Sequence, residues 1–292
     1  MSAGAATLFE RVAIVGVGLI GGSFGLALKA AKACREVVGI GRSRANLEVA
    51  RARGAIDSIA SEVPDCDLVL VAAPVAQFPV LFKNLSRGNL SERTLITDAG
   101  STKRDVVAAA RTALGSGIER FVPAHPIAGS EKSGAEAATA DLFKGKRVIL
   151  TPLAENTRES IARIEAVWAA CGAQVSTMDV QEHDSVLGTV SHLPHLLAYA
   201  LAQDVATRKN AARLFEIAGA GFRDFTRLAS SSPEMWRDIC LANRDLLLAD
   251  VALFESKLAE MKKHLSEGNA AALERMFEQA RDARDRWLKS SS

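Results

Sequence analysis

Val12-Ala-Ile-Val-Gly16-Val-Gly18-Leu-Ile-Gly21-Gly-Ser23 is the segment that best indicates how this chain folds. An apolar, β-branched run leads into glycines spaced Gly-x-Gly-x-x-Gly, and residues 22–32 then have the pattern of a helix. In a dinucleotide-binding turn the first glycine permits the turn, the second lets a pyrophosphate approach the backbone, and the third lets the helix pack on the strand. Glycines also gather in ordinary tight turns, but the flanking strand and helix favour the dinucleotide interpretation. We expect the cofactor to contact Gly16, Gly18, Leu19, Ile20 and Gly21.

Composition narrows the class of protein. With 292 residues, the chain is long enough for two domains of ordinary size. Its 36 basic and 34 acidic residues leave a formal charge of +2 with no basic block, so nucleic acid is not an expected partner. Residues 12–28 carry no charge, but their glycines fit the nucleotide fold better than a membrane span, and no cationic signal-peptide segment precedes them.

The cysteines give information on the compartment. All four are far apart in the sequence and lack Cys-x-x-Cys spacing, which argues against a zinc site and against a disulfide framework. We therefore expect reduced, mostly buried thiols in a cytoplasmic protein. The four residues are Cys34, Cys66, Cys171 and Cys240.

Hydrophobic patterning predicts two domains. Strand-like and helix-like runs alternate from residue 11 to about residue 100, which is typical of a Rossmann-type, doubly wound parallel sheet, and further strand-like runs follow as far as residue 178. Beyond residue 178 the pattern is helical, with breaks near residues 207, 219–227, 231–233 and 268. We predict a dinucleotide-binding domain over residues 1–178 and an all-helical domain over 179–292, which binds substrate and forms a homodimer through its surplus apolar surface. After the first strand, the expected strands cover residues 36–40, 67–73, 94–97, 121–124, 147–150 and 173–178.

The end of the second strand bears on the choice of cofactor. In folds that prefer NAD, an acidic residue at this place takes the ribose 2′-hydroxyl. Here the strand ends at Gly41, and Arg42, Ser43 and Arg44 follow, which suits a 2′-phosphate. The two arginines could also merely be solvated at the start of the next helix. We favour NADP over NAD.

Three later strands deliver candidate site residues at their carboxyl ends, where parallel sheets bind ligands. Ala73 and Pro74 follow the third strand, at a place where the chain commonly passes the nicotinamide. Ser101 follows the next strand, and His125 comes directly after the strand over residues 121–124. The two latter residues can take part in proton chemistry.

The first long helix of the second domain carries a pair of histidines. His192 and His195 fall within one turn, and Asp184 projects on nearly the same side of the helix. Pro194 lacks an N–H and leaves the carbonyl of Val190 without its usual partner, which predicts a kink. The pair could equally be catalytic or hydrogen-bonded core residues. A metal site would need a third ligand that is not found nearby.

A second candidate lies in residues 218–227, Ala-Gly-Ala-Gly-Phe-Arg-Asp-Phe-Thr-Arg, of which we expect residues 219–227 to form a loop. Small residues let the backbone approach a ligand, and a guanidinium there could bind a carboxylate. A helix cap with a local Arg–Asp pair explains the pattern equally well.

With these residues assembled, the chain resembles the prephenate and arogenate dehydrogenases of tyrosine biosynthesis. The resemblance runs from about Arg11 to the helices after Trp236. Its most specific pieces are four motifs whose order and spacing fit the family: His-Pro-Ile-Ala-Gly at 125–129, Glu-His-Asp at 182–184, Ser-His-Leu-Pro-His at 191–195, and Gly-Phe-Arg-Asp-Phe-Thr-Arg at 221–227. Two positions depart from it, since Arg42 stands where many members have an acid and Ala220 where some have a second glycine.

The resemblance implies an NAD(P)-dependent oxidative decarboxylation of prephenate, arogenate or both. It implies a catalytic His125 hydrogen-bonded to the ring hydroxyl, with Ser101 beside it near the nicotinamide. The substrate pocket would contain Arg227 bound to a carboxylate, with His195, Trp236 and Gly221 as lining residues and His192, Asp184 and Glu131 as supporting or gating groups. Tyrosine is a candidate inhibitor. The rate should rise with pH through an ionisation near ~6.5, the ordinary value for histidine, because only a neutral His125 can accept the hydroxyl proton.

Two other functions remain open on the sequence. A β-hydroxyacid dehydrogenase also joins a Rossmann domain to a helical one, but it relies on a lysine in the first long helix, and no lysine lies between Lys146 and Lys209. A non-catalytic dinucleotide sensor would not need His125, Ser101 and Arg227 together.

Overall fold

The computed structural model describes residues 7–88, 90–130 and 132–290. The chain forms two compact units, one ending at Arg244 and the other beginning at Asp245. The first unit contains the sheets and every candidate site residue that the structure describes. The predicted functional division after residue 178 falls between the last strand and the helix that Asp179 caps, and it stays a prediction.

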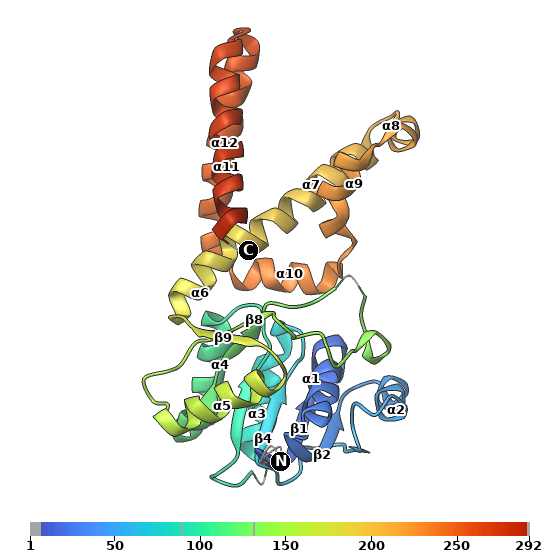
Figure 1. The fold of residues 1–292 in the computed structure, drawn as a ribbon, viewed down its shortest axis with the longest axis vertical. Helices are drawn as coiled ribbons and strands as arrows, with labels where there is room; N and C mark the ends of the chain where they lie inside the picture. The colour runs from blue at the N-terminus through green and yellow to red at the C-terminus, as the bar shows by residue number, and fades with distance from the viewer. Residues whose placement is uncertain (1–6, 89, 131, 291–292) are drawn as a thin grey trace. The chain divides into compact units, whose positions relative to one another are not determined.

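A six-stranded parallel sheet forms the centre of the first unit, in the order β3-β2-β1-β4-β5-β6 (Figure 1). The predicted doubly wound parallel sheet is thereby confirmed. The strands are β1 (Phe9–Val15), β2 (Cys34–Ile40), β3 (Ser58–Ile59), β4 (Leu68–Val71), β5 (Leu95–Asp98) and β6 (Phe121–Val122).

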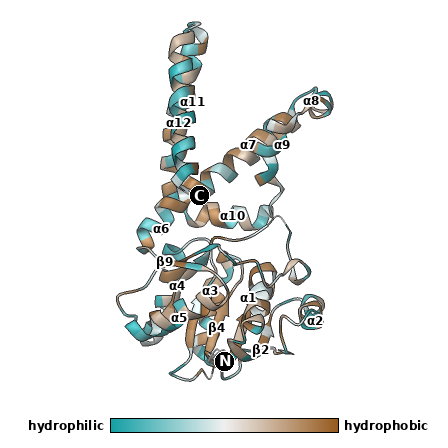
Figure 2. Ribbon diagram, in the orientation of Figure 1, coloured by the Kyte–Doolittle hydropathy of each residue, from teal (hydrophilic) through white to brown (hydrophobic). Residues whose placement is uncertain are grey.

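Helices cover both faces of this sheet because its strands carry apolar side chains on both sides, and β4 is coloured as hydrophobic in Figure 2. Along β1, Val12 and Ile14 enter one core with α1, α2 and α5, whereas Ala13 and Val15 enter the opposite core with α3, α4 and α10. The helices are α1 (Leu19–Ala30), α2 (Arg44–Ala52), α3 (Phe78–Arg87), α4 (Arg104–Leu114), α5 (Arg158–Ala170) and α10 (Pro233–Ala242).

The strands after β6 differ from the simple prediction of one continuous sheet. Pro123 interrupts the strand expected over residues 121–124, because proline has no N–H to donate to a sheet ladder. β6 stays in the first sheet, and β7 (Ala124–Pro126) pairs antiparallel with β8 (Arg147–Leu150), which pairs parallel with β9 (Gln174–Thr177). His125 therefore lies in a separate three-stranded sheet, opposite Ile149.

The rest of the chain is helical, as predicted. α6 (Val180–Leu187) passes through a π-helical turn (Gly188–His192) into α7 (Leu193–Thr207), and α8 (Ala211–Ile217) follows. The expected loop over 219–227 is wrong in part, since residues 220–226 form the short helix α9 (Ala220–Thr226). The second unit consists of α11 (Arg244–Ser266), apart from its first residue, and α12 (Ala270–Ser290). Among the described helices, none has the length and apolar character needed to cross a membrane.

Candidate active site

The glycine turn after β1 has the geometry that a dinucleotide needs. Gly16 has a φ of +98°, and a Cβ at this position would lie 2.3 Å from the carbonyl oxygen of Ala72. A Cβ on Gly21 would lie 2.2 Å from the carbonyl oxygen of Gly16, so helix and turn are in direct backbone contact. No described atom lies within 4 Å of a Cβ built on Gly18, which leaves its backbone open to a phosphate. Leu19 and Ile20 begin α1, whose first turn carries no acid, so its N–H groups can receive an anion.

Three polar residues, Arg42, Ser43 and Arg44, follow the end of β2, and Arg42 differs from the other two in its contacts. It is exposed and has no ion pair with any described residue. The side chain of Ser43 accepts a hydrogen bond from the backbone of Asn46 and caps α2, and Arg44 forms an ion pair with Glu48 at 2.6 Å. Arg42 is therefore the side chain of this group that remains available for a ligand.

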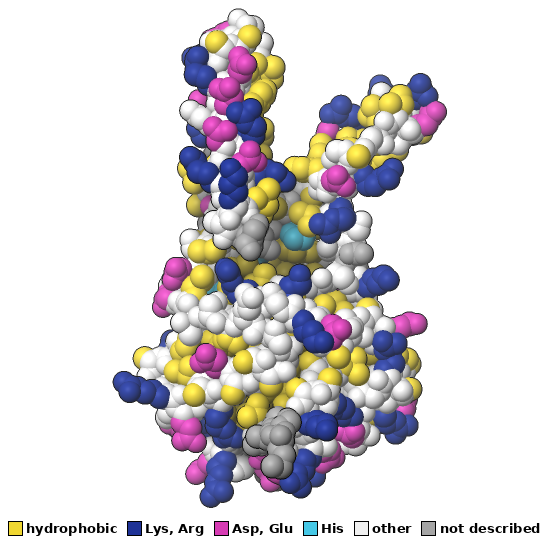
Figure 3. Space-filling model, in the orientation of Figure 1, with side chains coloured by type: hydrophobic (Ala, Val, Ile, Leu, Met, Phe, Trp, Pro, Cys, Tyr) yellow, Lys and Arg dark blue, Asp and Glu magenta, His cyan; other side chains and the backbone are white. Residues whose placement is uncertain are grey.

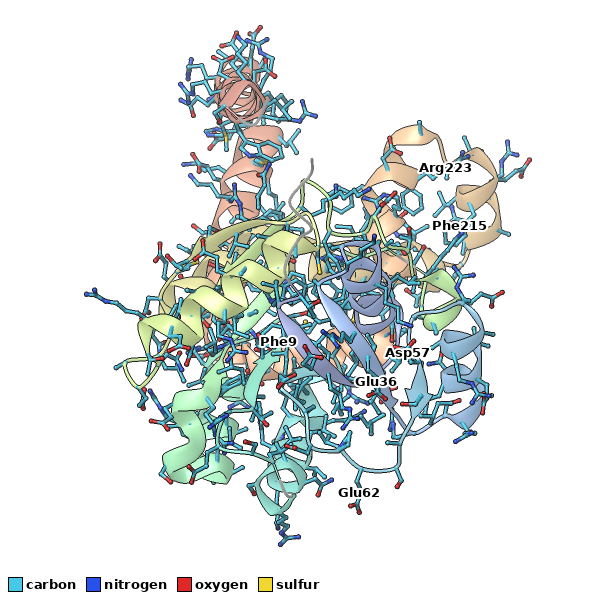
Figure 4. The ribbon with its side chains drawn as sticks, turned by 60° about the horizontal axis from the view of Figure 1, so that its bottom comes forward. Phe9, Glu36, Asp57, Glu62, Phe215 and Arg223 are labelled. Atoms are coloured by element: carbon cyan, nitrogen blue, oxygen red, sulfur yellow. The ribbon has the colours of Figure 1, made fainter. Side chains whose placement is uncertain are left out.

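Two carboxylates bind groups near the first residues of β2. Glu36 hydrogen-bonds to Arg11 at 2.7 Å, and Asp57 accepts the backbone N–H of Val37 at 2.8 Å (both acids are labelled in Figure 4). Both acids are thus engaged near the first residues of β2. Neither is placed at the carboxyl end of the strand to take a ribose 2′-hydroxyl.

A buried ion pair supports the strand that carries His125. Asp98, at the end of β5, accepts a hydrogen bond from the ammonium group of Lys103, and both side chains are fully buried. Both residues also bind the backbone of Ala124: Asp98 accepts its N–H at 2.9 Å, and Lys103 donates to its carbonyl at 2.8 Å. Because a buried pair is costly to break, it fixes the position of the residue before His125. Ser101, half-buried, lies between the two members of the pair in the sequence, and half-buried Ala73 and Pro74 follow β4.

His125 is the first member of a hydrogen-bonded chain of three side chains, which we call the imidazole array: His125, His183 and Asp184. Nδ1 of half-buried His125 lies 2.9 Å from Nε2 of His183, and Nδ1 of His183 lies 2.8 Å from Oδ1 of Asp184. His183 and Asp184 are fully buried. Burial lowers the pKa of His125 well below its ordinary value, and the neighbouring His183 and Lys103 lower it further. Burial also lowers the pKa of His183, so both rings are neutral at pH 7.

Asp184 is the fixed end of the array. Its carboxylate accepts the backbone N–H groups of Lys103 and Arg104 at 2.8 and 2.9 Å, and its backbone carbonyl accepts the side-chain amide of Asn243 at 2.8 Å. Burial opposes ionisation of Asp184, but hydrogen bonds from His183, Arg104 and Lys103 outweigh it and lower its pKa. The carboxylate therefore stays charged, with its oxygens occupied by groups of the protein.

His192 lies on the other side of Asn243, whose side-chain nitrogen is 3.1 Å from Nδ1 of His192. The His192 ring also hydrogen-bonds to the backbone of Ser101, and burial lowers its pKa to about 4. Both polar sides of this ring are thus used within the protein. The irregularity that Pro194 predicts is a π-helical turn, in which the N–H of Leu193 bonds to the carbonyl of Gly188, and His192 ends this turn.

His195 and Trp236 form an aromatic pair. Their rings stack with centroids 3.5 Å apart and planes 18° apart. Nδ1 of His195 bonds to the carbonyl of Ser191 at 2.9 Å, which leaves Nε2 for another partner. Burial lowers the pKa of His195, and the nearby exposed Arg227 adds to this effect. Figure 3 shows histidine surface among hydrophobic side chains in the region of α7 and α10.

The structure brings together most of the predicted site, though not all of it. Gly221 is exposed on α9, and no described atom lies within 4 Å of a Cβ built on it. Glu131 lies outside the described residues. All four cysteines are free, and three of them are buried, as predicted.

Sequence reasoning assigned no role to His183, Lys103, Arg104 or Asn243. His183 stands inside the 182–184 motif, and its position beside an acid is the one signal that could have singled it out. No local pattern marks Asn243, which is 59 residues from its partner Asp184.

Comparisons with known proteins show which family this chain is similar to. Residues 24–177 match the family described as prephenate dehydrogenase, nucleotide-binding domain, and residues 179–279 match prephenate dehydrogenase, dimerization domain. The prephenate dehydrogenase of Bacillus subtilis is 36% identical over 94% of this chain and 76% of its own length. The cyclohexadienyl dehydrogenase of Zymomonas mobilis is 33% identical over 95% of this chain and 96% of its own. A crystal structure of prephenate dehydrogenase from Aquifex aeolicus with hydroxyphenyl propionate and NAD+ superposes with a TM-score of 0.89 at 35% identity, covering 95% of this chain and 98% of that one.

Proposed function

The chain belongs to the prephenate dehydrogenase family, and from this premise we propose that it oxidatively decarboxylates prephenate, arogenate or both with a nicotinamide dinucleotide. The observation that carries the proposal is His125, a half-buried imidazole whose pKa is lowered by burial. A ring that is neutral at pH 7 can accept the proton of the substrate hydroxyl. The glycine turn after β1 supplies the place for the dinucleotide.

The reaction divides between the cofactor and the protein. A bound nicotinamide would supply the acceptor for the hydride of the carbinol carbon of the cyclohexadienol. His125 accepts the hydroxyl proton as the carbonyl forms, and carbon dioxide then leaves with aromatisation as the driving force. The bonding electrons of the lost carboxylate enter the ring, and the resulting phenolate oxygen takes the proton back.

The remaining candidate residues hold the substrate. Arg227 binds a carboxylate of the substrate, and the stacked rings of His195 and Trp236 line the pocket beside it. Ser101 lies near the nicotinamide and His125. The ring of His192 hydrogen-bonds to the backbone of Ser101 and so supports Ser101. Gly221 adds to the lining of the pocket, Ala73 and Pro74 lie on the nicotinamide side, and Glu131 takes part in gating.

One set of initial rates tests this proposal. Prephenate and arogenate are each combined with NAD and with NADP, and reduction of the nicotinamide is followed by absorbance. Turnover of at least one substrate is expected, with competition by tyrosine for the same site. A chain that binds the dinucleotide but reduces it with neither substrate would instead be a sensor.

We also propose that NADP is preferred over NAD, because Arg42 has no ion pair with a described residue and residues 41–44 include no acid. Replacing Arg42 with Ala should raise KM for NADP roughly 10- to 100-fold, the range of a hydrogen bond to a charged group, and change KM for NAD by less than about threefold. Arg44→Ala is the matched control, with a smaller effect since Arg44 already pairs with Glu48. Equal losses for both cofactors, or a wild-type preference for NAD, would contradict this assignment.

We further propose a homodimer built from the helical segments. In the first unit, α8 and α9 expose Phe215, Ile217 and Phe225 by 46%, 65% and 50%. In the second unit, α11 and α12 likewise expose large apolar side chains. Such surface is usually covered by a partner, and the family description of residues 179–279 as a dimerization domain agrees. Light scattering at micromolar concentration should give twice the chain mass, whereas a stable 31.0 kDa species would refute the dimer.

A further inference from the structure

We propose that His183 is a positioning residue for the reaction: it selects the tautomer of His125 that leaves Nε2 free as the base, and it receives the Nδ1 proton of His125 when Nε2 is protonated. The inference rests on the proposed function, because that function makes His125 the base. It goes beyond it by assigning a task to a side chain that is fully buried and does not need to touch the substrate.

The tautomers follow from the fixed end of the array. Asp184 is charged and can only accept, so the atom facing it, Nδ1 of His183, must carry a proton. His183 is neutral, and its Nε2 is then a lone pair. The atom facing that lone pair, Nδ1 of His125, must therefore be an N–H donor. A neutral His125 with a proton on Nδ1 has none on Nε2, which is thereby the basic atom.

Hydrogen bonds to the backbone hold Asp184 in the orientation that fixes the tautomers of the two histidines. Its two carboxylate oxygens also accept the backbone N–H groups of Lys103 and Arg104, which begin α4. The Asn243 amide holds its carbonyl. From the other side, the buried Asp98–Lys103 pair fixes the backbone of Ala124, so both ends of the array are anchored.

The proton movement balances within the array. As the substrate O–H bond breaks, an N–H bond forms at Nε2 of His125. The Nδ1–H bond of His125 then breaks, and an N–H bond forms at Nε2 of His183. The positive charge moves to His183, next to the carboxylate of Asp184, which stabilises it. After decarboxylation the same two transfers run in reverse and return the proton to the phenolate oxygen, so no proton is gained or lost by the protein.

Two substitutions separate the two tasks. His183→Phe removes the acceptor for the Nδ1 proton of His125. His183→Gln can offer an amide oxygen near the former Nε2, which keeps an acceptor but takes no proton. We expect kcat to fall about 10²-fold in H183F and by less in H183Q, because a wrong tautomer removes the base. KM for substrate and cofactor should change by less than about threefold in both variants.

The decisive measurement is the tautomer itself. The chain has five histidines, so selective ¹⁵N-histidine labelling gives few NMR signals, and His125→Asn identifies that of His125. The wild-type protein should show His125 protonated at Nδ1, and H183F should lose this signature. Glu182→Gln, an exposed neighbour on α6, is the matched control and should change neither the signal nor kcat.

The outcomes are distinct. A wild-type His125 protonated at Nε2, an H183F variant with unaltered tautomer and kcat, or an H183Q variant with unaltered kcat would overturn the inference. The wild-type spectrum decides even where H183F does not fold. Absence of turnover with either substrate, together with a His125 proton on Nδ1, would count against the proposed function and not against the array.

Discussion

Replacing His125 with Asn should lower kcat by roughly 10²–10⁴-fold, with a much smaller change in KM, because the imidazole interacts with the hydroxyl proton mainly in the transition state. Asn is the appropriate substitute. Its amide nitrogen can take the place of Nδ1 and donate to Nε2 of His183, so the array stays hydrogen-bonded while the atom corresponding to Nε2 is removed. Steady-state rates at saturating cofactor measure the effect, and dinucleotide binding by the variant serves as the control for folding.

The pH profile gives an independent check on His125. The neutral ring is the active form, so the rate is full above the pKa of His125 and falls as the pH drops through it. The expectation of an acid limb near ~6.5 requires correction, since burial lowers the pKa of His125. We expect a flat rate across neutral pH and a decline only at more acidic pH, with an apparent value that belongs to the array as a whole. Near-normal kcat with the same acid limb in H125N would end this mechanism and direct attention to His195.

Arg227→Ala should act mainly on KM. A guanidinium that holds a carboxylate contributes to ground and transition states alike, and truncating one member of such a pair costs roughly 2–5 kcal/mol, equivalent to an increase of about 30-fold to several thousand-fold. The KM for prephenate or arogenate is measured at saturating cofactor. Arg223→Ala, exposed on the neighbouring α9, is the matched control, and Figure 4 labels this residue. A loss confined to kcat, or an equal rise of KM in R223A, would remove Arg227 from the substrate site.

Local sequence signals predicted the cofactor half of the molecule well. The glycine spacing, the strand before it and the helix after it lie within one short segment, so Gly16, Gly18 and Gly21 could be assigned their separate tasks, and each has the matching geometry. His125 and Ser101 could be singled out because they follow strands, and strand ends of a parallel sheet meet at one edge.

What could not be predicted depends on long-range pairing. The missing N–H of Pro123 is a local signal for a break in the strand, but the continuation of the chain into a second sheet depends on where β8 lies. His125 and His183 are 58 residues apart, and Lys103 and Asp184 are 81 apart, so their hydrogen bonds have no sequence periodicity. Residues 220–226 begin with two small residues, which suggest a loop. They form the helix α9 instead, and this helix packs against α7, a contact that the local sequence does not indicate.

The hydrogen bond from Asn243 to Asp184 affects the order in which the cofactor turn and the imidazole array can form during synthesis. The contact between Gly16 and Ala72 needs only the first 72 residues, whereas the hydrogen bond by which Asn243 anchors Asp184 forms only once residue 243 has been synthesised. Since chains fold from the N-terminus as they leave the ribosome, the glycine turn can form before the last anchor of the imidazole array exists. A chain truncated before residue 243 would lack this anchor on Asp184, and the orientation of His125 would depend on the remaining hydrogen bonds of the array.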